Sequence, residues 1–352
     1  VGEKNALALT KSGQKITILW PGMSWARLSL HQRWVGRTPT RTNQIVSVGD
    51  VIYVRQENNQ WFLSQIPDVE AAFIALNPQN GSIEALVGGF NFLKSKFNRA
   101  TQSQRQPGSS FKPFLYAAAL NKGYTLATLI NNGPIVVDDP SQPSVWRPHN
   151  NERTFSGPTR LKEALIHSLN LVSIRILDDL GFDYMIDFAA RFGFDKKQLP
   201  RGLSLALGSL SVSPMDLTRA YAVFANGGFK IEPYLIDHIT NNEGKLLFKA
   251  KPVAVCSNCQ TNNPSSATIA PRVIPADVAF FMYTALQGVI QKGTGHAAAV
   301  LNRPDIAGKT GTTNDQMDAW FAGFNSDLVV TTWVGFDTPQ SLHAYGASLA
   351  LP

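Results

Sequence analysis

The chain has 352 residues, of which 44% are hydrophobic, 10% aromatic and 16% charged, and its formal net charge is +7. This length is expected to hold one large domain and one small one, and the composition excludes a disordered protein. The basic residues form no long block and no stripe interleaved with aromatic residues, which argues against a nucleic-acid partner.

Residues 1–63 predict a small domain of β-strands, because short apolar and β-branched runs alternate there with Gly, Asn and Asp. The five strand candidates are residues 6–9, 15–19, 44–48, 51–54 and 61–63. Five strands in so short a span predict a small antiparallel barrel that is OB-like, in the sense of a partly open Greek key. The alternative is an N-terminal β extension of the domain that follows.

Residues 64–352 predict one larger domain that opens with a β-hairpin. Residues 70–76 and 82–89 are its strand candidates, and Asn80 with Gly81 in the turn is a strong hairpin signal. The hairpin is expected to supply two strands to the sheet of this domain.

Residues 109–112 read S-S-F-K and stand at the start of a predicted helix over residues 111–120. In a helix, residues three apart share a face, so Ser109 Oγ and Lys112 Nζ are expected side by side. A serine hydroxyl needs an adjacent base near neutral pH, and Lys112 can be that base when burial or a nearby cation lowers its pKa. The alternative is that Ser109 is only the N-cap of a buried helix.

Residues 168–170 read S-L-N and lie between two stretches with apolar residues at helical spacing. Ser168 is expected to carry a proton to a leaving amine. Asn170 is expected to hold Lys112 and a substrate amide by hydrogen bonds. A loop in which Ser168 and Asn170 cap two helices is compatible with both roles.

Residues 309–312 read K-T-G-T and are expected to lie on a strand, with residues 305–308 leading in; two further strand candidates follow at residues 319–324 and 328–335. Together with the hairpin, these strands predict an antiparallel sheet built from both ends of the domain and covered by the helices between them. The expected fold class is therefore α+β, with the serine helix buried at its centre.

The K-T-G-T strand is expected to bind an anion. Lys309 and Thr310 would receive a substrate carboxylate, and Gly311 would let the substrate backbone approach the strand closely. The backbone N–H groups of Ser109 and Thr312 would form an oxyanion hole for a tetrahedral intermediate.

The motifs S-x-x-K, S-x-N and K-T-G, in this order, form the signature set of serine acyl-transferases that react with penicillin. Beyond these motifs, the chain resembles the transpeptidase part of the class A, bifunctional penicillin-binding proteins of Gram-negative bacteria over residues 64–345. The further segments that carry the resemblance are residues 98–100, 105–109, 146–150, 155–158, 205–208, 212–214, 221–228 and 292–297.

The resemblance implies a penicillin-binding, β-lactamase-like transpeptidase fold behind an OB-like domain, with no metal and no organic cofactor. It implies a D,D-transpeptidase that cross-links peptidoglycan stem peptides through a serine acyl-enzyme and is acylated and inhibited by β-lactams. The catalytic residues that it implies are Ser109, Lys112, Ser168, Asn170 and Lys309. The implied contacts of the substrate or β-lactam are Thr310, Gly311, Thr312, Thr313, Ser110 and Trp146.

Members of this family normally begin with a short cytoplasmic tail, a membrane helix and a glycosyltransferase domain. Here no apolar stretch approaches the ~18 residues of a spanning helix, and no signal peptide opens the chain. We therefore expect a piece of a longer protein, anchored at the periplasmic face of the inner membrane by a missing N-terminal helix. Donor and acceptor stem peptides are its expected partners, with an envelope regulatory protein at the OB-like domain.

Cys256 and Cys259 form a C-x-x-C motif in a polar segment that predicts a mobile insertion near residues 250–270. The oxidising periplasm that the resemblance implies favours a disulfide between them over free thiols. A zinc site would need two further ligands, which no nearby Cys or His pair supplies. A redox motif would need a helix after the first Cys.

Other functions share these motifs or this fold. A D,D-carboxypeptidase differs only in its acceptor, since water replaces the amine. A serine β-lactamase must activate a deacylating water, and no clear Glu follows S-x-N for that task. A β-lactam sensor domain is acylated once and then signals, whereas a degenerate scaffold is disfavoured by the intact set of three motifs.

Overall fold

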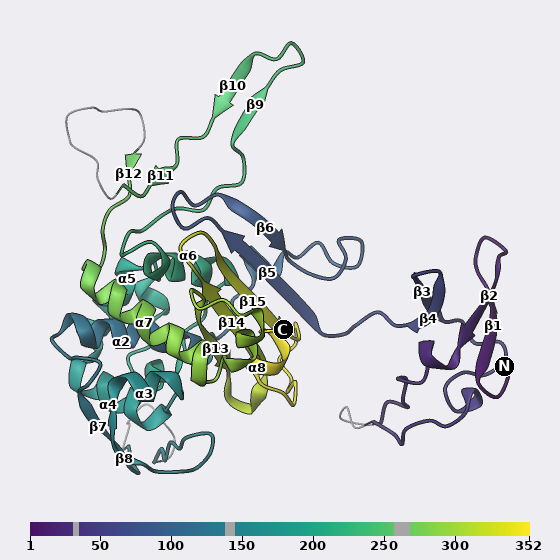
Figure 1. Ribbon diagram of the computed structural model, residues 1–352, viewed down its shortest axis with the longest axis horizontal. Helices are drawn as coiled ribbons and strands as arrows, with labels where there is room; N and C mark the ends of the chain where they lie inside the picture. Colours follow the sequence, from purple (N-terminus) through teal and green to yellow (C-terminus); the bar gives the residue numbers. More distant parts are fainter. Residues whose placement is uncertain (31–34, 138–144, 257–267) are drawn as a thin grey trace. The chain divides into compact units, whose positions relative to one another are not determined.

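The computed structural model describes residues 1–30, 35–137, 145–256 and 268–352. Contacts within the chain divide it into two compact units, Val1–Asp68 and Val69–Pro352, which are both drawn in Figure 1. No helix in the described ranges is long and apolar enough to span a membrane.

The N-terminal unit is built on a four-stranded sheet in the order β1-β2-β4-β3. Its strands are β1 (Asn5–Leu9), β2 (Lys15–Leu19), β3 (Tyr53–Glu57) and β4 (Gln60–Ser64). The pairs β1–β2 and β3–β4 are antiparallel, whereas β2 and β4 are parallel neighbours. Alternate residues of β2 are buried, as expected of a strand with one face on a core. That core contains Ala6, Ile18, Met23, Val46 and Leu63.

The strand predicted at residues 44–48 is wrong. Thr42–Gln44 instead form a 3₁₀ turn, η3, in which the Gln44 side chain accepts hydrogen bonds from two preceding backbone N–H groups. The N–H of Val46 then donates to the Thr42 carbonyl oxygen at 3.0 Å. These local bonds hold the backbone in a turn, and Val46 reaches the core from that turn.

The larger unit is centred on a five-stranded antiparallel sheet in the order β13-β14-β15-β5-β6. Its strands are β5 (Glu70–Leu76), β6 (Ile83–Val87), β13 (Ala307–Thr312), β14 (Asp318–Phe324) and β15 (Val329–Gly335). The last strand, β15, pairs with the first, β5, along their whole lengths. Both ends of the unit therefore join in one sheet, which confirms the predicted antiparallel sheet and the α+β class.

Helices lie against this sheet (Figure 1), and α6 and α7 pack directly on it. The helices are α1 (Arg99–Gln102), α2 (Lys112–Asn121), α3 (Leu161–Ile166), α4 (Asn170–Leu180), α5 (Phe182–Arg191), α6 (Pro214–Ala225), α7 (Ala276–Lys292) and α8 (Gly346–Leu349). Short strand pairs complete the described strands: β7 (Leu129–Asn132) with β8 (Gly157–Arg160), β9 (His238–Thr240) with β10 (Leu246–Lys249), and β11 (Val253–Ala254) with β12 (Thr268–Ile269).

The helix α2 lies at the centre of the larger unit, as the sequence predicts. Every residue from its first, Lys112, to Leu120 is buried, so the helix has no solvent-facing polar stripe. The ring of Phe114 lies within 5.6 Å, centroid to centroid, of the rings of Phe111, Phe192, Phe194, Tyr221 and Phe224. This aromatic packing fixes the helix that follows the predicted nucleophile.

Candidate active site

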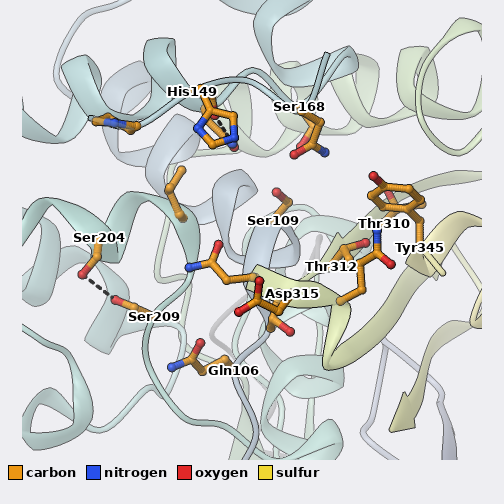
Figure 2. Close-up of a pocket in the computed structure, with 18 of the residues that line it drawn as sticks. Gln106, Ser109, His149, Ser168, Ser204, Ser209, Thr310, Thr312, Asp315 and Tyr345 are labelled. Carbon is orange, nitrogen blue, oxygen red and sulfur yellow. Dashed lines mark hydrogen bonds between the residues drawn. The ribbon is translucent and has the colours of Figure 1, made fainter. Parts of the chain in front are cut away.

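A cavity of about 1190 Å³ lies in the larger unit, where the residues before α2, the start of α4 and the end of β13 meet. Figure 2 shows Ser109, Ser168, Thr310 and Thr312 among the side chains that line it. The residues predicted for the site that line this cavity are Ser109, Ser168, Asn170, Thr310, Thr312, Thr313 and Trp146. The three motifs, which are far apart in the sequence, therefore meet at one cavity.

Ser109 lies in a 3₁₀ turn, η4 (Gly108–Phe111), that leads directly into α2. The preceding Gly108 has a φ of 54°, which favours glycine. A Cβ added to Gly108 would lie 2.5 Å from the carbonyl oxygen of Thr312. Glycine is therefore required at this position for the serine turn to sit against β13.

Ser110 and Gly311 do not line the cavity. Ser110 is fully buried, and its hydroxyl has no hydrogen-bond partner among the described residues. A Cβ added to Gly311 would lie 2.3 Å from Ser110 Oγ and 2.4 Å from the carbonyl oxygen of Pro107. The missing side chain of Gly311 thus makes room for the serine turn, which approaches β13 most closely at Ser110. The substrate contacts predicted for these two residues stay predictions.

Lys112 is the first residue of α2 and is fully buried. Its Nζ donates to Asn170 Oδ1 and to the backbone oxygen of Ser168, both at 2.6 Å, and lies 3.3 Å from Ser168 Oγ. In the part of the chain that the structure describes, no hydrogen bond joins this Nζ to Ser109 Oγ. Hydrogen bonds of this kind are often long in an unliganded enzyme and tighten when substrate binds.

The hydroxyl of Ser168 bridges two buried lysines. Besides the contact with Lys112, Ser168 Oγ accepts from Lys309 Nζ at 3.0 Å, and this Nζ also donates to the carbonyl oxygen of Thr310 at 3.0 Å. A serine hydroxyl can accept from one amine and donate to another that is neutral, so this geometry suits a proton relay. Neither lysine is paired with a carboxylate of any described residue.

Burial without a counter-ion changes the proton affinity of both lysines. Burial, together with the charge of Lys309, holds the pKa of Lys112 well below the usual value for lysine. Burial also lowers the pKa of Lys309 to about 7. Both shifts favour the neutral amine, which is the form that a general base requires.

The backbone of Ser168 is held at a φ of 56°, where a residue other than glycine is strained. We expect the variant Ser168→Gly to be more stable than Ser168→Ala by about 1 kcal/mol, because only glycine relieves this strain. Both variants lack the hydroxyl, so both should be acylated by a β-lactam ~10²-fold more slowly than the wild type. Thermal unfolding and stopped-flow acylation test the two effects separately. Equal stabilities of the two variants would contradict the backbone strain at Ser168. Acylation at the wild-type rate would contradict the role of its hydroxyl in the proton relay.

The start of α4 is capped by a side chain from outside the helix. Leu169, at the N-cap position, offers no side-chain acceptor. Instead, Asn150 Oδ1 accepts hydrogen bonds from the backbone N–H groups of Asn170 at 2.9 Å and Leu171 at 3.3 Å. Asn150 is buried, and its Nδ2 donates to Asn132 Oδ1 at 2.8 Å. This cap satisfies two N–H groups that a helix start leaves unpaired.

The same segment fixes the side chain of Asn170. Its Nδ2 donates to the carbonyl oxygen of His149 at 3.0 Å, so its Oδ1 is the atom that faces Lys112. The sequence predicts no role for Asn150 beyond its place in residues 146–150. A cap that acts across 20 positions leaves no local pattern to find.

Replacing Asn150 by alanine is expected to destabilise the protein by about 1–3 kcal/mol, because it leaves buried polar groups unpaired. Acylation should also slow, since Asn170 loses its fixed position. The variant Asn150→Asp keeps both acceptor bonds to α4 and is expected to lose less stability. Urea unfolding of the three proteins checks this order. An alanine variant as stable as the wild type would show that the cap contributes nothing.

The threonines of the β13 wall are also fixed by their neighbours. Thr310 Oγ1 donates to Thr294 Oγ1 at 2.8 Å, and Thr294 itself lines the cavity. Thr312 Oγ1 accepts from the backbone N–H of Gly346 at 3.0 Å. Thr294 was not predicted as a site residue, although it lies in the segment 292–297 that carries the resemblance.

Cys259 lies outside the described residues, so the disulfide between Cys256 and Cys259 stays a prediction. Residues 257–267 of the predicted mobile insertion lie outside them as well. Within the described ranges, no group of three or more His, Cys, Asp or Glu side chains is arranged to hold a metal ion.

Two protein-family models match the chain. Residues 71–351 match the penicillin-binding protein transpeptidase domain, and residues 1–69 match the penicillin-binding protein OB-like domain. Together they account for nearly the whole chain, and they separate it near the division between the two compact units.

The curated relatives include several penicillin-binding proteins 1A. The chain is 43% identical to that of Pseudomonas aeruginosa over 391 residues, covering 100% of this chain and 47% of the relative. It is 38% identical to that of Escherichia coli, covering 95% of this chain and 45% of the relative. The chain therefore spans about half the length of the curated relatives that it matches.

Solved structures show the same similarity. The crystal structure of penicillin-binding protein 1A from Haemophilus influenzae has a TM-score of 0.88 and 41% identity, covering 99% of this chain and 53% of that one. PonA1 from Mycobacterium tuberculosis, in complex with penicillin V, has a TM-score of 0.66 and 28% identity, covering 81% of this chain and 76% of that one.

Proposed function

The chain belongs to the penicillin-binding protein transpeptidase family, and we propose that it cross-links peptidoglycan stem peptides through an acyl-enzyme on Ser109. The observation that carries this proposal is the hydroxyl of Ser168, which bridges two buried lysines next to the cavity that Ser109 lines. This arrangement supplies a nucleophile, a base with a lowered pKa and a path for one proton.

The first half of the proposed reaction forms the acyl-enzyme. The C-terminal carboxylate of the donor stem binds charged Lys309, and neutral Lys112 takes the proton of Ser109. Ser109 Oγ bonds to the carbonyl carbon of the penultimate D-alanine, and the backbone N–H groups of Ser109 and Thr312 hold the developing oxyanion. The C–N bond then breaks, and the proton passes from Lys112 through Ser168 to the leaving D-alanine.

The second half transfers the acyl group to the acceptor. The neutral amine of a second stem peptide bonds to the ester carbonyl carbon, and the bond from that carbon to Ser109 Oγ breaks. The amine gives up one proton, which returns to Ser109 by the same relay. A β-lactam can take the place of the donor in the first half of the reaction. Its leaving amine stays attached to the acyl group, so the adduct is released slowly.

The setting of this reaction is also part of the proposal. We assign the OB-like domain to the N-terminal unit and the transpeptidase to the larger unit. We place the protein at the periplasmic face of the inner membrane, in a longer class A protein that also polymerises glycan. The OB-like domain is proposed to bind an envelope regulatory protein, and Cys256 and Cys259 to form a disulfide in that compartment.

The test follows intact mass over time with benzylpenicillin and maps the adduct to a peptide. A one-to-one adduct on the peptide that contains Ser109, lasting many minutes, is expected. A second assay gives the acyl-enzyme of a D-Ala-D-Ala peptide the choice between water and an amine acceptor. Transfer to the amine supports a transpeptidase, and release to water alone would make it a carboxypeptidase. Rapid release of hydrolysed penicillin would make it a β-lactamase, and an adduct elsewhere would overturn the proposal.

A further inference from the structure

Asp315 has a distinct place in the cavity. Among the lining residues that the structure describes, it carries the only carboxylate. Its side chain is exposed and makes no hydrogen bond or ion pair with any described residue. The other charged or titratable groups on the wall are Arg147, His149, His343 and Tyr345. An unpaired carboxylate in a cavity with this lining is suited to a cationic ligand.

The loop that presents this carboxylate is strained and held in place. Asp315 has a φ of 53° and Gln316 a φ of 56°, so two consecutive residues other than glycine adopt a left-handed conformation. The N–H of Gln316 donates to the Thr313 carbonyl oxygen at 3.1 Å, and the N–H of Leu342 donates to the Gln316 carbonyl oxygen at 2.8 Å. Strain that the surroundings maintain in this way is typical of functional sites.

We propose that Asp315 binds the ammonium group of the acceptor stem peptide, which deepens and rests on the proposed transpeptidase function. The loop follows Thr312 directly, so it continues the wall of the cavity formed by β13. The two charges of the reaction then have separate places. The donor carboxylate lies at Lys309, and the acceptor ammonium lies at Asp315.

A carboxylate at this place counteracts the repulsion between the positively charged site and a cationic acceptor. The charge of Lys309 makes the neighbourhood of Ser168 electropositive, which repels an incoming ammonium. A carboxylate on the cavity wall raises the local concentration of the cationic acceptor in spite of that repulsion. Binding forms no covalent bond. Before attack, the ammonium group releases one proton to solvent water, so Lys112 stays neutral, and the neutral amine then bonds to the ester carbonyl carbon.

The test compares Asp315→Asn with Asp178→Asn. Asparagine tolerates a left-handed φ, so the first variant removes the charge and keeps the loop. Asp178 is an exposed carboxylate of α4 that makes no hydrogen bond or ion pair with described residues, so its variant matches the charge change. Two acceptors are used, Nα-acetyl-L-lysyl-D-alanine and the same peptide with diaminopimelic acid in place of lysine. The donor is a D-Ala-D-Ala peptide without a cationic side chain.

We expect the acceptor KM of Asp315→Asn to rise about tenfold over that of Asp178→Asn, the effect of one charge-assisted hydrogen bond. The increase should shrink at high salt, because the carboxylate is exposed. Benzylpenicillin acylation, measured in the same samples, reports whether the nucleophile is intact. An acceptor KM within twofold of the control, or a rise in the donor KM instead, would overturn the assignment. A wild type that is not acylated would instead overturn the proposed function.

Discussion

The variant Ser109→Ala is expected to lose all covalent modification by benzylpenicillin, a fall of at least ~10⁴-fold, because it lacks the hydroxyl that forms the acyl bond. Ser109 is half-buried and lines the cavity together with Thr310 and Thr312. Intact mass spectrometry after prolonged incubation measures the effect directly. The fold should be unaffected, since the hydroxyl makes no hydrogen bond with a described residue.

The neighbouring Ser110→Ala is the matched control. Its hydroxyl is buried against Gly311 and has no hydrogen-bond partner among the described residues. Removing a buried, unpaired hydroxyl should leave stability unchanged or raise it by about 1 kcal/mol. Acylation should remain near the wild-type rate. An adduct on the Ser109→Ala protein would contradict the assignment of Ser109 as the nucleophile. So would loss of the adduct in Ser110→Ala alone.

The elements that position the site follow from strong local patterns. The K-T-G-T segment and the two apolar runs that follow it, which are bounded by turn residues, form β13, β14 and β15 as expected. The serine helix is a long apolar run after a Pro-Gly breaker, and it forms α2. In each case the secondary structure that the local sequence favours is also the one that buries its apolar side chains in the core.

The remaining features depend on contacts between distant parts of the chain. Gly311 has the pattern of a glycine that admits a ligand, yet its missing side chain makes room for Ser110. Asn150 caps a helix that begins 20 residues later. Residues 44–48 have a strand-like composition, but the Gln44 side chain closes a turn there. Periodicity and propensity do not encode such pairings, because each depends on which surface the folded chain brings close.

The variant Lys112→Met is expected to slow acylation by 10²–10⁴-fold, the usual contribution of a general base. Methionine fills a similar volume and cannot accept a proton. The comparison variant is Lys122→Met, which removes an exposed lysine just after the other end of α2 and should leave the rate unchanged. Stopped-flow fluorescence with a labelled penicillin gives both rates. If Lys112→Met is acylated within tenfold of the wild-type rate, another group is the base.

The pH dependence of this variant distinguishes a base from a merely structural lysine. Burial lowers the pKa of both Lys112 and Lys309, to about 7 for Lys309, below the ordinary value of 10.5 in the unfolded chain. Between the folded and unfolded pKa values, the unfolded state holds the extra protons, so wild-type stability should rise with pH across this window. Below it both states are protonated, and the full destabilisation is present.

Lys112→Met removes one of these two groups and should therefore show a smaller gain in stability between pH 7 and pH 9.5. Its residual acylation should also lose the rise with pH that reflects formation of neutral Lys112 in the wild type. A purely structural lysine would alter the stability curve and leave the shape of the rate profile intact. Both curves are measured on the wild type and on Lys112→Met. If the stability difference between the two proteins does not change with pH, and the rate profile keeps its shape, Lys112 is not the buried base.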